Sequence, residues 1–132
     1  MVNKLATIFL VDDDKNIVLL LEKFLEYYGH KIIDCAFNGE EAIQKYKNFD
    51  KFPDLVIMDH RMPFKNGIQA TKEILKRNPL SKIIFLSADF TAREEAIELG
   101  INSFIEKPFD FHKLSEIIKN TLPKKKKQSQ LV

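Results

Sequence analysis

The chain has 132 residues, a length that suits one domain with a buried core and is too short for two ordinary domains. Its formal net charge is only +2, and residues 124–127 alone contribute four lysines, so the remainder is slightly acidic and gives no charge argument for nucleic-acid binding. A single cysteine cannot form an internal disulfide, and no apolar stretch is long enough for a signal peptide or a membrane span, so we expect a cytoplasmic protein.

Short apolar runs alternate along the chain with segments whose apolar residues recur at helical spacing. The runs predict β-strands and the amphipathic segments predict α-helices. In chain order we expect a strand at residues 7–11, a helix at 17–28, a strand at 31–36, a helix at 40–48, a strand at 55–58, a helix from 68 to near 78, a strand at 82–86, a helix at 92–99, a strand at 103–105 and a helix at 110–122. Asp14 is expected to cap the first helix.

The alternation of strand and helix five times predicts an α/β fold. Residues 55–58 are continuously apolar, which is typical of a central strand covered by helices on both faces. Right-handed crossovers then place helices on both faces of one doubly wound parallel sheet. We expect this domain to span residues 1–123 and residues 124–132 to form a basic, disordered tail.

Polar side chains stand where four of the apolar runs end: Asp12 and Asp13, Asp59, Ser87 and Lys107. Ligands of parallel α/β folds bind in the crevice outside the carboxyl ends of the strands. Three carboxylates, one hydroxyl and one ammonium are therefore expected to meet at one edge of the sheet.

Three carboxylates in one place repel each other, and a hard divalent cation relieves that repulsion. Mg²⁺ suits the site best, because it is usually held by one or two carboxylates and keeps its other positions for water and phosphate. A lysine and a serine could hold the remaining phosphoryl oxygens. Asp59 stands alone after the central strand, so it is the candidate nucleophile for an aspartyl phosphate, while Asp12 and Asp13 share the metal.

These residues lie in four motifs, LVDDD, DLVIMDHRMPFKNG, FLSAD and FIEKPF. With them, the chain resembles the receiver domain of two-component response regulators over roughly residues 5 to 122. The resemblance implies a flavodoxin-like (βα)5 fold with strand order 2-1-3-4-5, an order that the chemotaxis regulators of this family exemplify.

The resemblance also implies roles for individual residues. Asp59 is the phosphoacceptor, and Ser87 and Lys107 bind the phosphoryl group. Asp13, Asp59 and the main-chain carbonyl of Arg61 bind Mg²⁺, with Asp12 acting through water. The implied phosphodonor is a sensor histidine kinase or a phosphotransfer protein.

A switch is implied as well. An aromatic residue at the position of Phe104 turns inward when the hydroxyl residue, here Ser87, moves toward the phosphoryl group; a core aromatic is the simpler interpretation. The downstream protein target would bind the face of the fourth helix, the fifth strand and the last helix.

Arg61 and Asp89 flank the path of the hydrolytic water in this family. Their opposite charges predict an ion pair over the phosphoryl group that slows its loss.

Each motif taken singly also fits an ordinary structural role. An acidic run after a strand is often a helix cap, Ser87 could form a local turn, and a Lys-Pro pair is usually a surface turn. The alternatives for the whole chain are a receiver-shaped scaffold that works without phosphorylation and an aspartate-nucleophile phosphohydrolase. The hydrolase would need an acid at the position of Arg61. Cys35 is expected to be a small buried apolar residue, and His60 a solvated loop residue.

Overall fold

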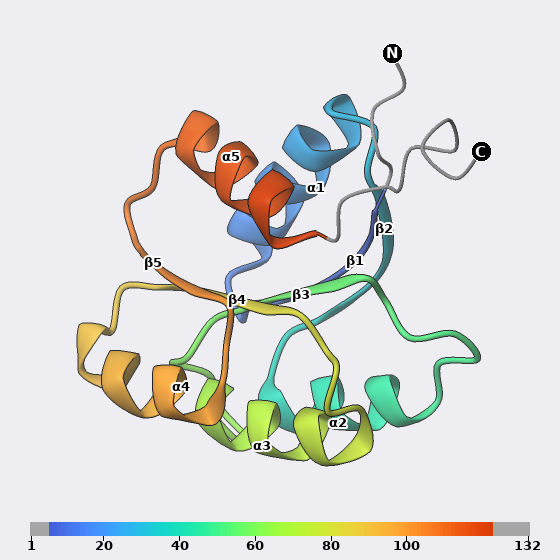
Figure 1. The fold of residues 1–132 in the computed structure, drawn as a ribbon, viewed down its shortest axis with the longest axis vertical. Coiled ribbons are helices and arrows are strands. Elements are labelled where there is room, and N and C mark those ends of the chain that lie inside the picture. Colours follow the sequence, from blue (N-terminus) through green and yellow to red (C-terminus); the bar gives the residue numbers. More distant parts are fainter. Residues whose placement is uncertain (1–5, 123–132) are drawn as a thin grey trace, which may run out of the picture.

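A computed structural model describes residues 6–122, which form one five-stranded parallel sheet flanked by five α-helices (Figure 1). The strand order is β2-β1-β3-β4-β5, so β1 and β3 lie side by side at the point where the order of the chain reverses. This architecture confirms the predicted (βα)5 fold and its strand order. The predicted tail at 124–132 lies outside the described residues.

The elements follow the predicted alternation closely. The strands are β1 (Thr7–Val11), β2 (Lys31–Ala36), β3 (Leu55–Met58), β4 (Ile83–Ser87) and β5 (Ser103–Glu106). The helices are α1 (Lys15–Tyr27), α2 (Gly39–Lys47), α3 (Gly67–Arg77), α4 (Arg93–Leu99) and α5 (Phe111–Thr121), with a 3-10 turn η1 (Phe90–Ala92) before α4.

The sheet separates two apolar cores because successive side chains of a strand point to opposite faces. In β1, Ile8 and Leu10 pack under α1 and α5, whereas Phe9 and Val11 pack under α2, α3 and α4 (Figure 1). All four residues of β3 are buried, as expected for its central place. Both cores end at the carboxyl ends of the strands, where the polar residues begin.

Local signals fix where the helices begin. Asp14 is the N-cap of α1 and accepts hydrogen bonds from the backbone N–H groups of Asn16 and Ile17, which confirms its predicted role. Asn66 caps α3 in the same way, and the Gln69 side chain accepts a bond from the Asn66 N–H. The caps hold the start of each helix at the same edge of the sheet as the polar strand ends.

Two expectations about single residues are wrong. Cys35 is only partly buried, because β2 is an edge strand and most of its residues are half covered. The His60 side chain is 15% exposed rather than solvated, because it packs toward the loop after β4, where its Nε2 lies 3.9 Å from Asp89 Oδ2. None of the helices among residues 6–122 has the length and apolar character needed to cross a bilayer.

Candidate functional site

Three carboxylates converge where β1 and β3 end. Asp12 and Asp13 follow β1, and Asp59 follows β3. One oxygen from each of these three acids lies within 4.8 Å of the others. The adjacency of β1 and β3 creates this acid cluster, because Val11 pairs with Met58 and the Asp59 N–H continues the ladder to the Val11 carbonyl at 2.8 Å.

The three acids differ in exposure. Asp12 and Asp59 are 3% and 6% exposed, whereas Asp13 is open to solvent. Asp12 Oδ1 accepts the Asp14 N–H at 2.9 Å, and Asp59 Oδ1 accepts the His60 N–H at 2.8 Å. Two buried acids held by backbone donors therefore face one acid that water reaches.

Lys107 brings a positive charge to the cluster from the end of β5. Its Nζ lies 2.7 Å from Asp12 Oδ2 and 3.8 Å from Asp59 Oδ2. The Lys107 N–H donates to the Ser87 carbonyl at 3.0 Å, which continues the β4–β5 pairing past the end of the strand. The lysine is therefore positioned by the sheet, and its ammonium bridges the two buried acids.

Ser87 is the last residue of β4, one residue later than the predicted strand end, and it is fully buried. Its Oγ accepts the Asp89 N–H at 3.0 Å. The hydroxyl is thus tied to the loop between β4 and α4. A change in the position of Ser87 would be felt directly at Asp89.

The electrostatics of the cluster centre on Asp59. Burial, followed by the negative charge of Asp12, raises the pKa of Asp59 to about 6 from its ordinary 3.8. Lys107, the His60 N–H and the Ser87 hydroxyl act in the opposite direction and do not cancel the rise. The folded protein thus disfavours the ionised form of Asp59 and would gain from a nearby cation.

A hard cation fits this donor set. Carboxylate oxygens are the ligands that Mg²⁺ prefers, and Asp12, Asp13 and Asp59 offer three within 4.8 Å of one another. Lys107 does not offset the burial of Asp59 and the charge of Asp12, which together raise the pKa of Asp59, so a cation would favour the ionised carboxylate. Coordination of the metal by the main-chain carbonyl of Arg61 stays a prediction.

The loop after Asp59 owes its shape to two glycines. A Cβ on Gly67 would collide with the Asp59 carbonyl oxygen, and a Cβ on Gly39 would collide with the Lys65 carbonyl oxygen. The Gly67 N–H also donates to the His60 carbonyl at 2.9 Å. The sequence predicts this helix from residue 68, but Gly67 is its first residue, and the missing side chain lets α3 pack against the end of β3.

An ion pair between Arg61 and Asp89 joins the loop after β3 to the loop after β4. Arg61 Nε lies 3.0 Å from Asp89 Oδ2; the Arg61 side chain is 80% exposed and that of Asp89 only 9%. Hydrogen bonds from Thr91, and then from Arg61, hold the pKa of Asp89 at about 2. His60 Nε2 approaches the same oxygen at 3.9 Å, a contact that sequence reasoning missed.

Phe104 lies on β5 next to the aromatic rings of the β4 side. Its ring centroid is 5.9 Å from that of Phe85, in a stacked arrangement, and 6.1 Å from that of Phe90, edge to face. Phe104 is half-buried, whereas Phe90 is 55% exposed. The half-buried ring lies between the core and solvent, and its role as a switch stays a prediction.

The chain was compared with known proteins. The family model described as the response regulator receiver domain matches residues 8–119. The chemotaxis protein CheY of Thermotoga maritima is 39% identical over 113 residues, which cover 84% of this chain and 92% of that protein. Protein CcdB of Bacillus subtilis is 38% identical over 120 residues, which cover 89% of this chain and 98% of that protein.

A solved structure leads to the same family through its fold. One chain of the CheX–CheY–BeF3–Mg²⁺ complex from Borrelia burgdorferi aligns with a TM-score of 0.84 at 31% sequence identity. The alignment covers 89% of this chain and 90% of that chain. The sequence comparison and the structure comparison therefore both find CheY proteins similar to this chain.

Proposed function

The chain belongs to the response regulator receiver domain family, and we propose that it is a phosphorylation-dependent switch of a two-component phosphorelay that accepts a phosphoryl group on Asp59. One observation carries this proposal above all. The three acids of the cluster converge within 4.8 Å, and the Lys107 ammonium lies 3.8 Å from Asp59 Oδ2. A nucleophile, a cation site and a fixed positive charge thus share one edge of the sheet.

The two oxygens of Asp59 have different surroundings. Oδ1 accepts the His60 N–H, whereas Oδ2 faces Lys107. We assign the attack to Oδ2: it forms the new P–O bond while the P–N bond of a phosphohistidine breaks. The imidazole of the donor keeps the electron pair of that bond and takes up a proton.

Lys107 and Ser87 would stabilise the transferred group. The Lys107 ammonium lies between Asp12 and Asp59, so a phosphoryl oxygen on Asp59 can share it with Asp12. The Ser87 hydroxyl can donate its proton to a second oxygen, because in its bond with the Asp89 N–H the Ser87 Oγ is only the acceptor. These two residues orient the phosphoryl group and balance its charge.

Asp12, Asp13, Asp59 and the main-chain carbonyl of Arg61 would hold Mg²⁺. When bound, Mg²⁺ neutralises charge on the phosphoryl oxygens during transfer. The raised pKa of Asp59 supports this role, since a cation beside the carboxylate favours its ionised, nucleophilic form.

Transmission would start at Ser87. When its hydroxyl turns toward the phosphoryl group, Phe104 moves into the vacated space and the face formed by α4, β5 and α5 changes. A downstream protein would read this face, and a sensor histidine kinase or phosphotransfer protein would supply the phosphoryl group. No direct nucleic-acid contact is part of this proposal, and the site of action would be the cytoplasm.

The Arg61–Asp89 pair would set the lifetime of the signal. The pair joins the loop after β3, which begins at Asp59, to the loop after β4, which begins after Ser87, and its 3.0 Å contact supports the proposal that a guanidinium borders the approach to Asp59. A water molecule attacking in line would have to pass this pair.

Intact-mass measurement tests the proposal. The protein is incubated with acetyl phosphate and Mg²⁺, beside the Asp59→Asn variant and the matched control Asp50→Asn, which changes an exposed aspartate far from the cluster. We expect one phosphoryl group on the wild type and the control and none on Asp59→Asn. Full labelling of Asp59→Asn would refute the assignment.

A further inference from the structure

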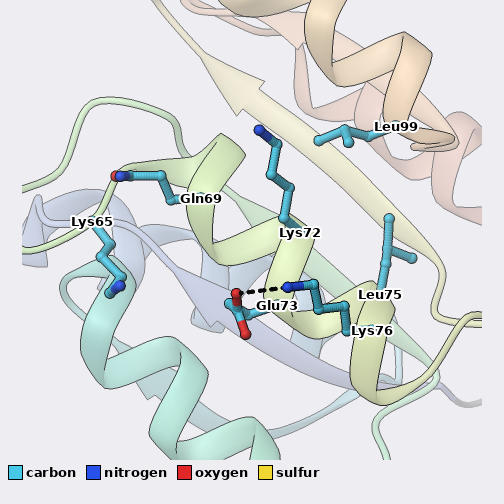
Figure 2. Close-up of a pocket in the computed structure, with 7 residues that line it drawn as sticks. All are labelled: Lys65, Gln69, Lys72, Glu73, Leu75, Lys76 and Leu99. Atoms are coloured by element: carbon cyan, nitrogen blue, oxygen red, sulfur yellow. Dashed lines mark ion pairs between the residues drawn. The ribbon is translucent and has the colours of Figure 1, made fainter.

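α3 and α4 border one shallow hollow, and the charged residues that line it, three lysines and Glu73, lie on its α3 side (Figure 2). The hollow measures about 510 Å³, and its apolar residues are Leu75 from α3 and Leu99 from α4. Both leucines are partly buried and pack against the core below. The hollow lies on the α2–α3–α4 side of the sheet, away from α1 and α5.

The α3 side of this hollow, here called the α3 bank, carries Lys65 from the loop before α3 and Lys72, Glu73 and Lys76 from α3, so its lysines outnumber its one acid. Each lysine has one carboxylate within 3.5 to 3.9 Å, and the paired side chains are 43% to 75% exposed. Exposed ion pairs of this kind contribute at most about 1 kcal/mol each and exchange partners readily. The α3 bank therefore remains available to other acidic groups.

The α4 bank is the set of exposed acids that α4 carries next to this hollow, Glu94, Glu95 and Glu98; Leu99, not these acids, is the α4 residue that lines the hollow, and Ala96 packs into the core. Glu95 reaches across the hollow to Lys72 at 3.6 Å. Within residues 6–122, no lysine or arginine forms an ion pair with Glu94 or Glu98. The α4 bank thus carries more negative charge than the α3 bank neutralises.

We propose that this surface is a self-complementary interface that binds a second copy of the chain. In a two-fold arrangement, the α3 bank of each copy faces the α4 bank of the other, and Leu75 and Leu99 of both copies meet at the centre. The result is an apolar centre with charged pairs on its rim, which is the usual construction of a protein interface. The arrangement does not depend on phosphorylation of Asp59.

Charge complementarity selects a second copy over other occupants. A peptide of one charge would be attracted to one bank and repelled by the other. A second copy offers both an acidic and a basic bank, since it is the same surface rotated by half a turn. The small hollow and the exposed charges point to weak association that salt suppresses.

Sedimentation velocity with paired charge-reversal variants tests this interface. One variant, K65E/K72E/K76E, makes both banks acidic, and the other, E94K/E95K/E98K, makes both banks basic. At low salt, we expect the sedimentation coefficient of the wild type to rise with concentration and each variant to stay monomeric. An equimolar mixture of the two variants should associate at least about tenfold more tightly than either variant alone, because every bank then meets its opposite.

A matched control and a folding check make the result decisive. K23E/K113E/K119E lowers the net charge by the same amount as K65E/K72E/K76E, but on α1 and α5, on the other face of the sheet, and should associate like the wild type. Circular dichroism identifies any unfolded variant, in which case the single changes Lys72→Glu and Glu95→Lys are mixed instead. A wild type that stays monomeric at low salt, or a mixture no tighter than its separate variants, would overturn the proposal.

Discussion

The acid cluster and the α3–α4 surface both bring charged side chains within about 4 Å of each other, but they differ in their access to water. At the cluster, Asp12 and Asp59 are almost fully buried, and the pKa of Asp59 rises to about 6. Over the hollow, Lys72 and Glu95 are at least half exposed. Buried charges store unfavourable free energy that a ligand can release, whereas exposed charges chiefly determine which partner is preferred.

The largest expected effect is on metal binding. Asp13→Ala removes one of three clustered oxygen ligands and should lower the affinity for Mg²⁺ by at least about tenfold. Isothermal titration of Mg²⁺ measures the change, with Asp50→Ala as a control of equal charge change. Unchanged Mg²⁺ affinity in Asp13→Ala would remove this residue from the metal site.

The second effect concerns stability without metal. Because the pKa of Asp59 is about 6 in the folded protein and 3.8 ordinarily, ionisation of Asp59 favours the unfolded chain, and stability falls as the pH rises through this interval. Asp59→Asn should therefore raise the free energy of unfolding at pH 7 by about 1 to 2 kcal/mol. This gain in the free energy of unfolding should vanish as the pH falls below about 4, because Asp59 is then protonated and neutral, like the asparagine of the variant.

Urea denaturation of both proteins without Mg²⁺, at several pH values, measures this difference. If Asp59→Asn is no more stable than the wild type at pH 7, burial of the ionised Asp59 side chain does not lower the free energy of unfolding.

The third effect is on the rate of dephosphorylation. It concerns an ion pair of mixed exposure, because Arg61 is exposed and Asp89 is nearly buried. Arg61→Ala and Asp89→Ala should each quicken dephosphorylation by about two- to fivefold, which corresponds to about 0.4 to 1 kcal/mol. The double variant should be little faster than either single one, since the pair acts as a unit. Decay of the phosphorylated proteins is followed by intact mass; independent, multiplying effects would argue against a shared gate.

The smallest effect is expected at the exposed surface. Glu95→Gln removes the Lys72–Glu95 pair and should change the free energy of unfolding by no more than about 0.5 kcal/mol. Thermal denaturation of dilute protein measures it. A loss several times larger would mean that the pair holds α4 in place and would weaken the contrast with the acid cluster.

The strand ends could be predicted from the sequence because periodicity locates them and parallel topology collects them at one edge. Asp12, Asp59, Ser87 and Lys107 were placed there on that argument, and the structure brings them together. The cap role of Asp14 follows from equally local chemistry.

Other features depend on contacts between distant segments and leave no local pattern. The approach of His60 to Asp89 and the closer pairing of Lys107 with Asp12 than with Asp59 arise from how three loops pack. Gly67 belongs to α3 because its missing side chain admits the Asp59 carbonyl, and only the folded chain shows which atom that is. Such a glycine next to a strand-end acid is a signal that could be sought in other sequences.

The most direct measurement of the central claim locates the phosphoryl group itself. After incubation with acetyl phosphate and Mg²⁺, borohydride reduces an aspartyl phosphate to homoserine, and peptide mass spectrometry then identifies the modified position. The acid cluster, with Asp59 Oδ2 facing Lys107, predicts homoserine at position 59 and at no other aspartate. Homoserine at Asp12 or Asp13, or a phosphoryl group on Ser87 that survives borohydride, would contradict the assignment of Asp59 as the acceptor.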